Sequence, residues 1–310
     1  MNDPARSWSR AARRVARPSA LRRQPVPPGS HTAFVLAGGG SRGAVQVGML
    51  AELVDRGIRA DSVYGASVGA VNGAAYCGDP TPAGMERLAD VWLHLADDDV
   101  FPRSRVHGPW QWFQQRPSVH SIGGLRRVVA QALTFQNLED APIPLEIVAT
   151  SLADGRDRRI SQGPALDAVL ASAAIPGVFP PVLVGDELLV DGGVVDNVPI
   201  SRAVEGGATR IYVLLCGPLH VHPPEPRRPA EAVLTALFVA IHARFVRELE
   251  QLPPGVEVVV FSGGGGPTAT YHDFSSTVEL MAEGRAEVAA ALGRRPEPVG
   301  GTAGHEVTAT

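Results

Sequence analysis

Residues 32–70 read TAFVLAGGGSRGAVQVGMLAELVDRGIRADSVYGASVGA, and this stretch decides the fold. A continuous apolar run at 33–37 leads into a glycine-rich loop, and residues 45–56 then place apolar side chains at helical spacing. A short strand at 62–64 leads into a second glycine turn and a helix of small residues at 68–77. An uninterrupted apolar run is typical of a buried parallel strand, so strand, helix, strand in this order predict a βαβ unit.

The same alternation continues to the end of the chain. We expect further strands at 145–149, 188–190, 210–215 and 256–261, and further helices at 81–95, 125–133, 166–174, 230–251 and 275–292. Residues 97–124 show no regular period and are expected to be irregular. Strands that alternate with helices predict an α/β fold around a parallel sheet.

Composition narrows the class of protein. The 310 residues are 45% hydrophobic and 19% charged with a net charge of −4, which gives no case for nucleic-acid binding. The two cysteines, Cys77 and Cys216, have no zinc spacing and are expected to be free buried thiols in a reducing compartment. No apolar run is long enough to span a bilayer, and no apolar stretch follows the N-terminal arginine pairs, so we expect a cytoplasmic protein without a cleaved signal.

Three glycine-marked turns each follow or end an expected strand. They read GGGSRG at 38–43, GASVG at 65–69 and DGG at 191–193. The carboxyl ends of parallel strands lie at one edge of a sheet, where ligands bind. We therefore expect the three turns to converge on one site.

Ser67 is the candidate nucleophile of that site. It lies at the centre of G-x-S-x-G, between an expected strand and an expected helix. A strand-to-helix turn exposes a serine hydroxyl, Gly65 and Gly69 remove side chains that would clash with nearby backbone, and the helix N-terminus favours developing negative charge. The five letters alone are a weak signal, because a serine in a glycine turn also occurs as a plain turn residue.

The other two turns supply what a serine nucleophile needs. The backbone N–H groups of Gly38–Gly40 can form an oxyanion hole with no side chains in the way. Asp191, at the end of a strand and followed by glycines, can approach Ser67 and accept its proton. Arg42 is expected either to hold the loop through carbonyl groups or to contact an anionic head group.

Other interpretations of these motifs stay open on the residues alone. A histidine such as His242 or His272 could act as the base of a Ser-His-Asp hydrolase or acyltransferase, although we expect both, like His220 and His222, to be surface or packing residues. Glycines 38, 40 and 43 weakly match a dinucleotide fingerprint with Asp61 downstream, whereas the Gly-Lys-Ser/Thr end of a phosphate loop is absent. The remaining class is a lipid-binding regulatory protein with a vestigial site.

Taken together, the motifs resemble those of the patatin-like phospholipases, which carry G-G-G-x-R-G, G-x-S-x-G and D-G-A or D-G-G in this order. The blocks ASAAIPGVFPPV at 171–182 and DGGVVDNVPI at 191–200 are also similar, and the resemblance covers roughly residues 33–215. It implies a three-layer α/β/α sandwich with a mostly parallel central sheet, and hydrolysis of fatty acyl esters through an acyl-serine. It implies no metal and no cofactor.

The resemblance also assigns roles by position. Ser67 would be the nucleophile and Asp191 its base, in a dyad without histidine. The oxyanion hole would be formed by Gly38, Gly39, Gly40 and Ser41, with Arg42, Gly43, Gly65, Gly69, Gly192 and Gly193 as supporting motif residues.

Domain limits and partners follow from the same interpretation. We expect a disordered arginine-rich arm at 1–30, a patatin-like catalytic domain at 31–217, a C-terminal extension packed on it at 218–292 and a loose tail at 293–310. The expected partner is a lipid or phospholipid and not a nucleic acid. A peripheral membrane contact and the oligomeric state are left open.

Two apolar clusters have two interpretations each. Phe101, Trp110, Trp112 and Phe113 are expected to form either a lid or membrane-facing loop, or a loop pinned to the body by its aromatic rings. Phe238, Ile241, Phe245 and Leu249 recur at helical spacing, which favours a packing face over an acyl groove.

Overall fold

A computed structural model describes residues 29–101, 118, 120–218, 229–264 and 273–293. The predictions made for Trp110, Trp112, Phe113, His220, His222 and His272, for the arm up to residue 28 and for the tail from residue 294 lie outside these residues.

One eight-stranded sheet forms the centre of the molecule. Its strands are β1 (Thr32–Leu36), β2 (Ser62–Ala66), β3 (Leu145–Ser151), β4 (Asp157–Ile160), β5 (Val182–Val184), β6 (Glu187–Asp191), β7 (Arg210–Leu214) and β8 (Glu257–Phe261). The order is β5-β6-β3-β2-β1-β7-β8, with β4 paired to β3. The run from β3 to β8 is parallel throughout, which confirms the mostly parallel α/β sheet expected from the sequence.

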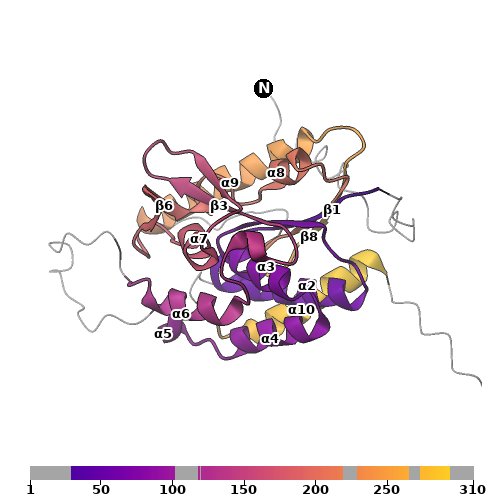
Figure 1. Cartoon of the computed structure of the whole chain (residues 1–310), viewed down its shortest axis with the longest axis horizontal. Coiled ribbons are helices and arrows are strands. Elements are labelled where there is room, and N and C mark those ends of the chain that lie inside the picture. The colour runs from indigo at the N-terminus through magenta and orange to yellow at the C-terminus, as the bar shows by residue number, and fades with distance from the viewer. Residues whose placement is uncertain (1–28, 102–117, 119, 219–228, 265–272, 294–310) are drawn as a thin grey trace, which may run out of the picture.

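Helices cover both faces of this sheet, as Figure 1 shows. They are α2 (Ala44–Asp55), α3 (Val68–Gly78), α4 (Pro82–Leu93), α5 (Asp97–Val100), α6 (Gly123–Ala132), α7 (Ala165–Ser172), α8 (Ile200–Glu205), α9 (Pro229–Glu250) and α10 (Thr277–Leu292), with short 3₁₀ turns η2 (Gly40–Gly43), η4 (Leu138–Asp140) and η5 (Gly192–Val194). Successive side chains of a strand point to opposite faces. Phe34 and Leu36 of β1 accordingly enter the core beneath α2 and α3, whereas Ala33 and Val35 enter a second core beneath α8 and α9. The three-layer arrangement follows from this alternation.

The antiparallel side of the sheet was not expected from the sequence. β4, β5 and β6 all pair antiparallel, β6 directly against β3. Gly185 and Asp186 form the two-residue connection between β5 and β6, and Gly185 has φ +63°. A glycine-containing pair between two apolar runs is a hairpin signal, and it was available in the sequence.

The segment after residue 217 shares the sheet and its cores. β8 extends the sheet beside β7, and α10 packs along α2. A Cβ at Gly48 would lie 1.9 Å from the Met281 carbonyl oxygen, and one at Gly284 would lie 2.0 Å from that of Val45, so the two helix backbones nearly touch. Where the domain boundaries fall remains a prediction.

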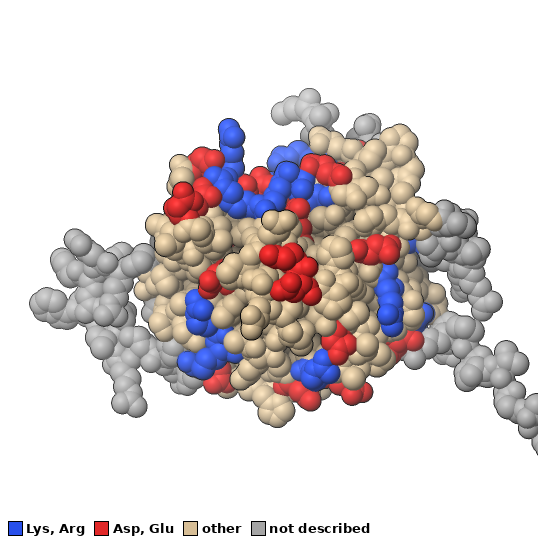
Figure 2. All heavy atoms as spheres, in the orientation of Figure 1, with Lys and Arg blue, Asp and Glu red and all other residues tan. Residues whose placement is uncertain are grey.

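The surface carries both signs of charge near the antiparallel edge. Arg158 pairs with Glu187, Arg202 pairs with Glu146, and Figure 2 shows basic and acidic side chains interspersed on one face. Cys77 and Cys216 are both free and buried, as expected. Among the helices of the described residues, none has the length and apolar character needed to cross a bilayer.

Candidate active site

Ser67 occupies a strained turn between β2 and α3. It has φ 55° and ψ −127°, and it is the only non-glycine residue with positive φ in the described part of the chain. A Cβ at Gly69 would lie 2.2 Å from the Leu36 carbonyl oxygen, and one at Gly65 would lie 2.7 Å from that of Gly69. The two glycines therefore let α3 start directly against β1 and β2, as the sequence motif predicted.

Strand register brings Asp191 beside Ser67. Ala66 pairs with Val148, and the next residue of β3, Ala149, pairs with Asp191. The Ser67 Oγ donates a hydrogen bond to Asp191 Oδ2 at 2.6 Å. The two turns thus converge, but the expected reason was wrong for Asp191, because it ends an antiparallel strand. Convergence occurs because β6 pairs only with the carboxyl-terminal half of β3.

Burial sets the protonation behaviour of Asp191. Its side chain accepts the Ser67 hydroxyl at one oxygen and the Gly193 N–H at the other, at 2.7 Å. Burial raises the pKa of Asp191 to about 6, and these two hydrogen bonds act in the opposite direction. The carboxylate is therefore ionised at neutral pH, yet far more basic than an exposed aspartate.

Ser172 holds the backbone of the serine turn. The Ser67 N–H donates to Ser172 Oγ at 2.9 Å, and the Ser172 hydroxyl donates to the Val148 carbonyl at 2.6 Å. This link joins the turn, α7 and β3. Sequence reasoning did not single out Ser172, although it lies in the block at 171–182, where a serine stands among alanines.

The glycine loop lies against Ser67 and the segment after Asp191. A Cβ at Gly38 would lie 2.9 Å from Ser67 Cβ and 2.3 Å from Asn197 Oδ1. The Gly38 N–H donates to the Asn197 carbonyl at 3.2 Å, so in this structure it is already engaged. Gly40 has φ +61° and starts η2, and the first N–H groups of a helix have no partner within it. Of the four residues expected to form the oxyanion hole, Gly40 and Ser41 line the pocket at Ser67, and the role of their N–H groups stays a prediction.

A buried polar network supports the loop from behind. Gln46 of α2 donates its amide hydrogens to the carbonyls of Ala37 and Leu214, at 2.8 and 2.9 Å. Asn72 of α3 donates to Gln46 Oε1 and accepts the Trp92 indole N–H at 2.9 Å. Both amide side chains are fully buried, and polar groups within otherwise apolar helices were the sequence signal for this network.

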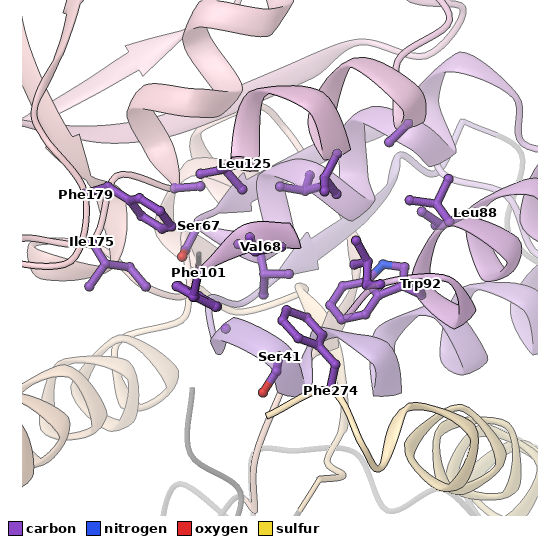
Figure 3. Close-up of a pocket in the computed structure, with 18 residues that line it drawn as sticks. Ser41, Ser67, Val68, Leu88, Trp92, Phe101, Leu125, Ile175, Phe179 and Phe274 are labelled. Carbon is purple, nitrogen blue, oxygen red and sulfur yellow. The ribbon is translucent and has the colours of Figure 1, made fainter. Parts of the chain in front are cut away.

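An apolar pocket opens at Ser67 (Figure 3). It encloses about 600 Å³ including its open mouth, and α3, α4 and α6 supply eight of its eighteen lining residues. The lining residues are Gly40, Ser41, Ser67, Val68, Val71, Leu88, Val91, Trp92, Leu95, Val100, Phe101, Leu125, Val128, Ala132, Ala173, Ile175, Phe179 and Phe274. Apart from Ser41 and Ser67 this lining is apolar or glycine, so the pocket suits a hydrocarbon chain whose polar end stays at Ser67.

Phe101 belongs to the wall of this pocket. It is buried, its ring stacks on Phe179 with centroids 5.4 Å apart, and it also stacks on Phe274 at 6.2 Å. Of the two interpretations offered for the aromatic stretch, this residue fits the pinned one.

His242 lines a different pocket from the one that Ser67 lines. Gly38 and Arg42 of the glycine loop line the His242 pocket too, together with Asn197 and Phe245. Of the four residues predicted to form a packing face, Phe245 and Leu249 of α9 are buried in the second core, as expected. Ile241 is half-buried and lines the His242 pocket, and the side chain of Phe238 lies outside the described part of the structure.

The supporting glycines lie in close contact with backbone or side-chain atoms of neighbouring segments. A Cβ at Gly43 would lie 2.3 Å from Val68 Cγ2, and one at Gly192 would lie 2.0 Å from the Val148 carbonyl oxygen. A Cβ at Gly193 would meet Asn197 Oδ1 at 2.6 Å. Each of these three glycines therefore permits an approach that a larger residue would hinder.

Comparison with known proteins gives consistent matches over this region. "Lysophospholipase NTE1" of Cryptococcus neoformans is 30% identical over 197 residues, which is 61% of this chain and 11% of that protein. "Uncharacterized NTE family protein MT1093" of Mycobacterium tuberculosis is 33% identical over 174 residues, 54% of this chain and 44% of that one. The chain thus spans about a ninth of the lysophospholipase and under half of the mycobacterial protein.

Two solved structures are similar at low identity. They are VipD from Legionella pneumophila (TM-score 0.46, 16% identity, 86% of this chain and 67% of that one) and human GIVD cytosolic phospholipase A2 (TM-score 0.47, 11% identity, 93% and 66%). The family model described as patatin-like phospholipase matches residues 34–204, which include all three glycine turns. This chain therefore belongs to the patatin-like phospholipase family.

Proposed function

We propose that the protein is a serine acyl hydrolase that cleaves fatty acyl ester bonds of lipids with a Ser67–Asp191 dyad. The observation that carries the proposal is the 2.6 Å hydrogen bond from Ser67 Oγ to Asp191 Oδ2 at the mouth of an apolar pocket. A serine hydroxyl becomes a nucleophile when a neighbouring base takes its proton. A carboxylate whose pKa is raised to about 6 by burial is suited to that task.

In the first half of the reaction, Ser67 Oγ bonds to the carbonyl carbon of the ester and its proton passes to Asp191. The carbonyl oxygen becomes negative and is stabilised by the N–H groups of Gly39 and Gly40, with the N-terminus of α3 pointing at the same region. The bond to the alcohol then breaks, and the alcohol leaves with the proton from Asp191. The acyl group remains on Ser67.

In the second half, water replaces the alcohol. The oxygen of a water molecule bonds to the acyl carbon while Asp191 takes a proton from that water, and the same N–H donors stabilise the second oxyanion. Collapse releases the fatty acid, and the proton returns to Ser67 Oγ. No histidine is needed, because the proton moves between one carboxylate and the reacting oxygens.

The substrate is proposed from the pocket and from the relatives. The pocket suits one hydrocarbon chain, and the family relative from Cryptococcus neoformans is named a lysophospholipase. We therefore propose phospholipids or lysophospholipids as substrates, which the protein meets at a membrane surface. Sedimentation of the protein with phospholipid vesicles tests this membrane contact. A protein that does not sediment with vesicles at lipid concentrations where it hydrolyses them would contradict the contact.

The test of the function is hydrolysis of p-nitrophenyl acyl esters and of lysophospholipid by the wild type and three variants. Ser67→Ala and Asp191→Asn are each expected to lower kcat/KM by a factor on the order of 10³ or more, because the dyad acts as a unit. His242→Ala is the matched control, since His242 lines a different pocket, and it is expected to retain activity.

Two results would reject the dyad. Loss of activity in His242→Ala with retention in Asp191→Asn would favour a Ser-His-Asp hydrolase. A wild type inert on every ester and phospholipid, yet able to bind lipid, would favour the non-catalytic regulatory protein.

A further inference from the structure

The far end of the apolar pocket is closed by a thin wall. In Figure 3 Leu88 lies at the opposite side of the pocket from Ser67, with Val68 between them. Three residues at this end, Leu88 and Val91 of α4 and Ala132 of α6, also line a second pocket. The same three side chains thus face both cavities.

The second pocket differs from the first in its lining. It encloses about 900 Å³ including its open mouth, and its polar lining residues are Arg87, Asp90, His94, Gln131 and Thr134. All five of these residues are exposed to solvent. The wall therefore separates a dry pocket that begins at Ser67 from a wet one on the protein surface.

We propose that Leu88, Val91 and Ala132 are the specificity-determining residues that set the longest acyl chain the enzyme accepts, an inference that rests on the proposed acyl hydrolase function. Burial of one methylene strengthens binding about fourfold, whereas a methylene that remains in water adds nothing. Affinity is therefore expected to increase with acyl-chain length until the chain reaches the wall, and not beyond that length.

The packing of the wall explains why single side chains control it. Leu88 is only 2% exposed and Ala132 only 8%, and α4 contacts α6 directly. Shortening Leu88 removes the bulk that divides the two cavities, whereas enlarging Ala132 fills the end of the first. The two changes act on chain length in opposite directions.

The experiment measures binding and turnover separately. Binding of saturated fatty acids of increasing length is measured by calorimetry with proteins that carry Ser67→Ala. Hydrolysis of the matching p-nitrophenyl esters is measured with proteins that retain Ser67. Affinity and kcat/KM are expected to rise with each methylene and then level off at one chain length. Leu88→Ala and the milder Val91→Ala should move that break to longer chains, and Ala132→Leu to shorter ones, with long-to-short ratios changed by roughly tenfold.

Matched controls separate this effect from loss of stability. Leu138 is 2% exposed like Leu88, Ala291 is 8% exposed like Ala132, and neither lines either pocket. Leu138→Ala and Ala291→Leu should leave the break where it is in the wild type.

The outcomes distinguish the wall from the reaction. An unmoved break in all three wall variants, or the same shift in the controls, overturns the inference even when ester hydrolysis is intact. A break that moves as expected in fatty-acid binding, in a protein inert on every ester, supports the wall and rejects the proposed hydrolase.

Discussion

At the scale of single residues, the site depends on one buried acid and one strained serine. Ser67 and Asp191 are 6% and 5% exposed, so neither is well solvated. Loss of hydration makes the carboxylate more basic, and positive φ presents the serine side chain outside the regular path of strand and helix. Both properties come from the environment and not from the residue types.

The pH dependence of activity should report Asp191. In the proposed mechanism ionised Asp191 accepts the proton, so kcat/KM is expected to rise with pH, reach half its plateau near pH 6, and stay flat above, following the pKa of about 6. The measurement is a pH–rate profile with a soluble ester. Asp196, also buried and with a pKa raised to about 7, does not contact Ser67, so Asp196→Asn is the control that should keep the inflection. If the inflection disappeared in Asp196→Asn, it would report the ionisation of Asp196, and the assignment to Asp191 would be wrong.

Strain at Ser67 should appear as a stability difference between two inactive variants. Ser67→Ala and Ser67→Gly both lose the bond to Asp191, but only glycine adopts φ 55°, ψ −127° without cost. We expect the free energy of unfolding of Ser67→Gly to be about 1 kcal/mol higher than that of Ser67→Ala. This difference is the relief of backbone strain less the destabilisation that glycine causes by making the unfolded chain more flexible. Denaturant titration checks this, and an alanine variant as stable as the glycine variant would argue against strain.

At the scale of elements, contact between helix and strand backbones sets the site. α3 begins against β1 at Gly69, and strand register then aligns Ser67 with Ala149 and Asp191. A shift of α3 would move Ser67 relative to Asp191, so the glycines of the motif act through backbone distance.

Two glycines of α3 provide a matched test. A Cβ at Gly69 would lie 2.2 Å from the Leu36 carbonyl oxygen, whereas one at Gly73 would lie 3.2 Å from the Val63 side chain, which can adjust. Gly69→Ala is expected to lower the free energy of unfolding by about 3 kcal/mol or more and to abolish activity. Gly73→Ala should stay within about 1 kcal/mol of the wild type, because better helix propensity offsets mild crowding. Equal stability of the two variants would contradict the backbone contact.

At the scale of the whole molecule, an ion pair with a buried carboxylate joins the helical layer opposite the apolar pocket to the segment after Asp191. Arg244 of α9 pairs with Asp196 at 3.3 Å and with Glu248 at 2.8 Å, and it also donates to the Val195 carbonyl. Asp196 is only 2% exposed, and burial raises its pKa to about 7. Since this folded-state pKa lies above the unfolded value of 3.8, the stability contribution of Asp196 falls as pH rises from about 4 to 7.

Removal of the Arg244 guanidinium should therefore lower the free energy of unfolding more at high pH than at low pH. Arg244→Met is expected to destabilise the protein by about 3 kcal/mol at alkaline pH, where it leaves a buried carboxylate without its ion-pair partner, and by less in mild acid, where Asp196 is protonated. Thermal unfolding across this pH range is the measurement. Asp196→Asn combined with Arg244→Met should restore part of the loss, and a pH-independent cost would contradict the role of Asp196.

Much of the fold could be predicted from the sequence because it depends on local patterns of apolar residues and glycines. Apolar runs and helical spacing located β1, α2, β2 and α3, and motif order led to Ser67 and Asp191, whose mutual contact is present. The antiparallel strands β4 and β5 were missed because they are short and half-exposed. Ser172 and Asn197 were missed as site residues because a single serine or asparagine shows nothing about its partner far along the chain.

The sequence by itself determined the parallel βαβ order and the glycine turns, and it singled out Ser67 and Asp191 as the candidate nucleophile and base, because these features depend on backbone conformation and spacing within short segments. Only the tertiary structure showed which antiparallel strand brings Asp191 to Ser67, that the Gly38 N–H donates to the Asn197 carbonyl, and where the apolar pocket lies. Those properties depend on register, burial and packing between segments far apart in the chain, such as those of Ser67 and Asp191, which are 124 residues apart. Local pattern does not encode such contacts, since they exist only when both partners are folded.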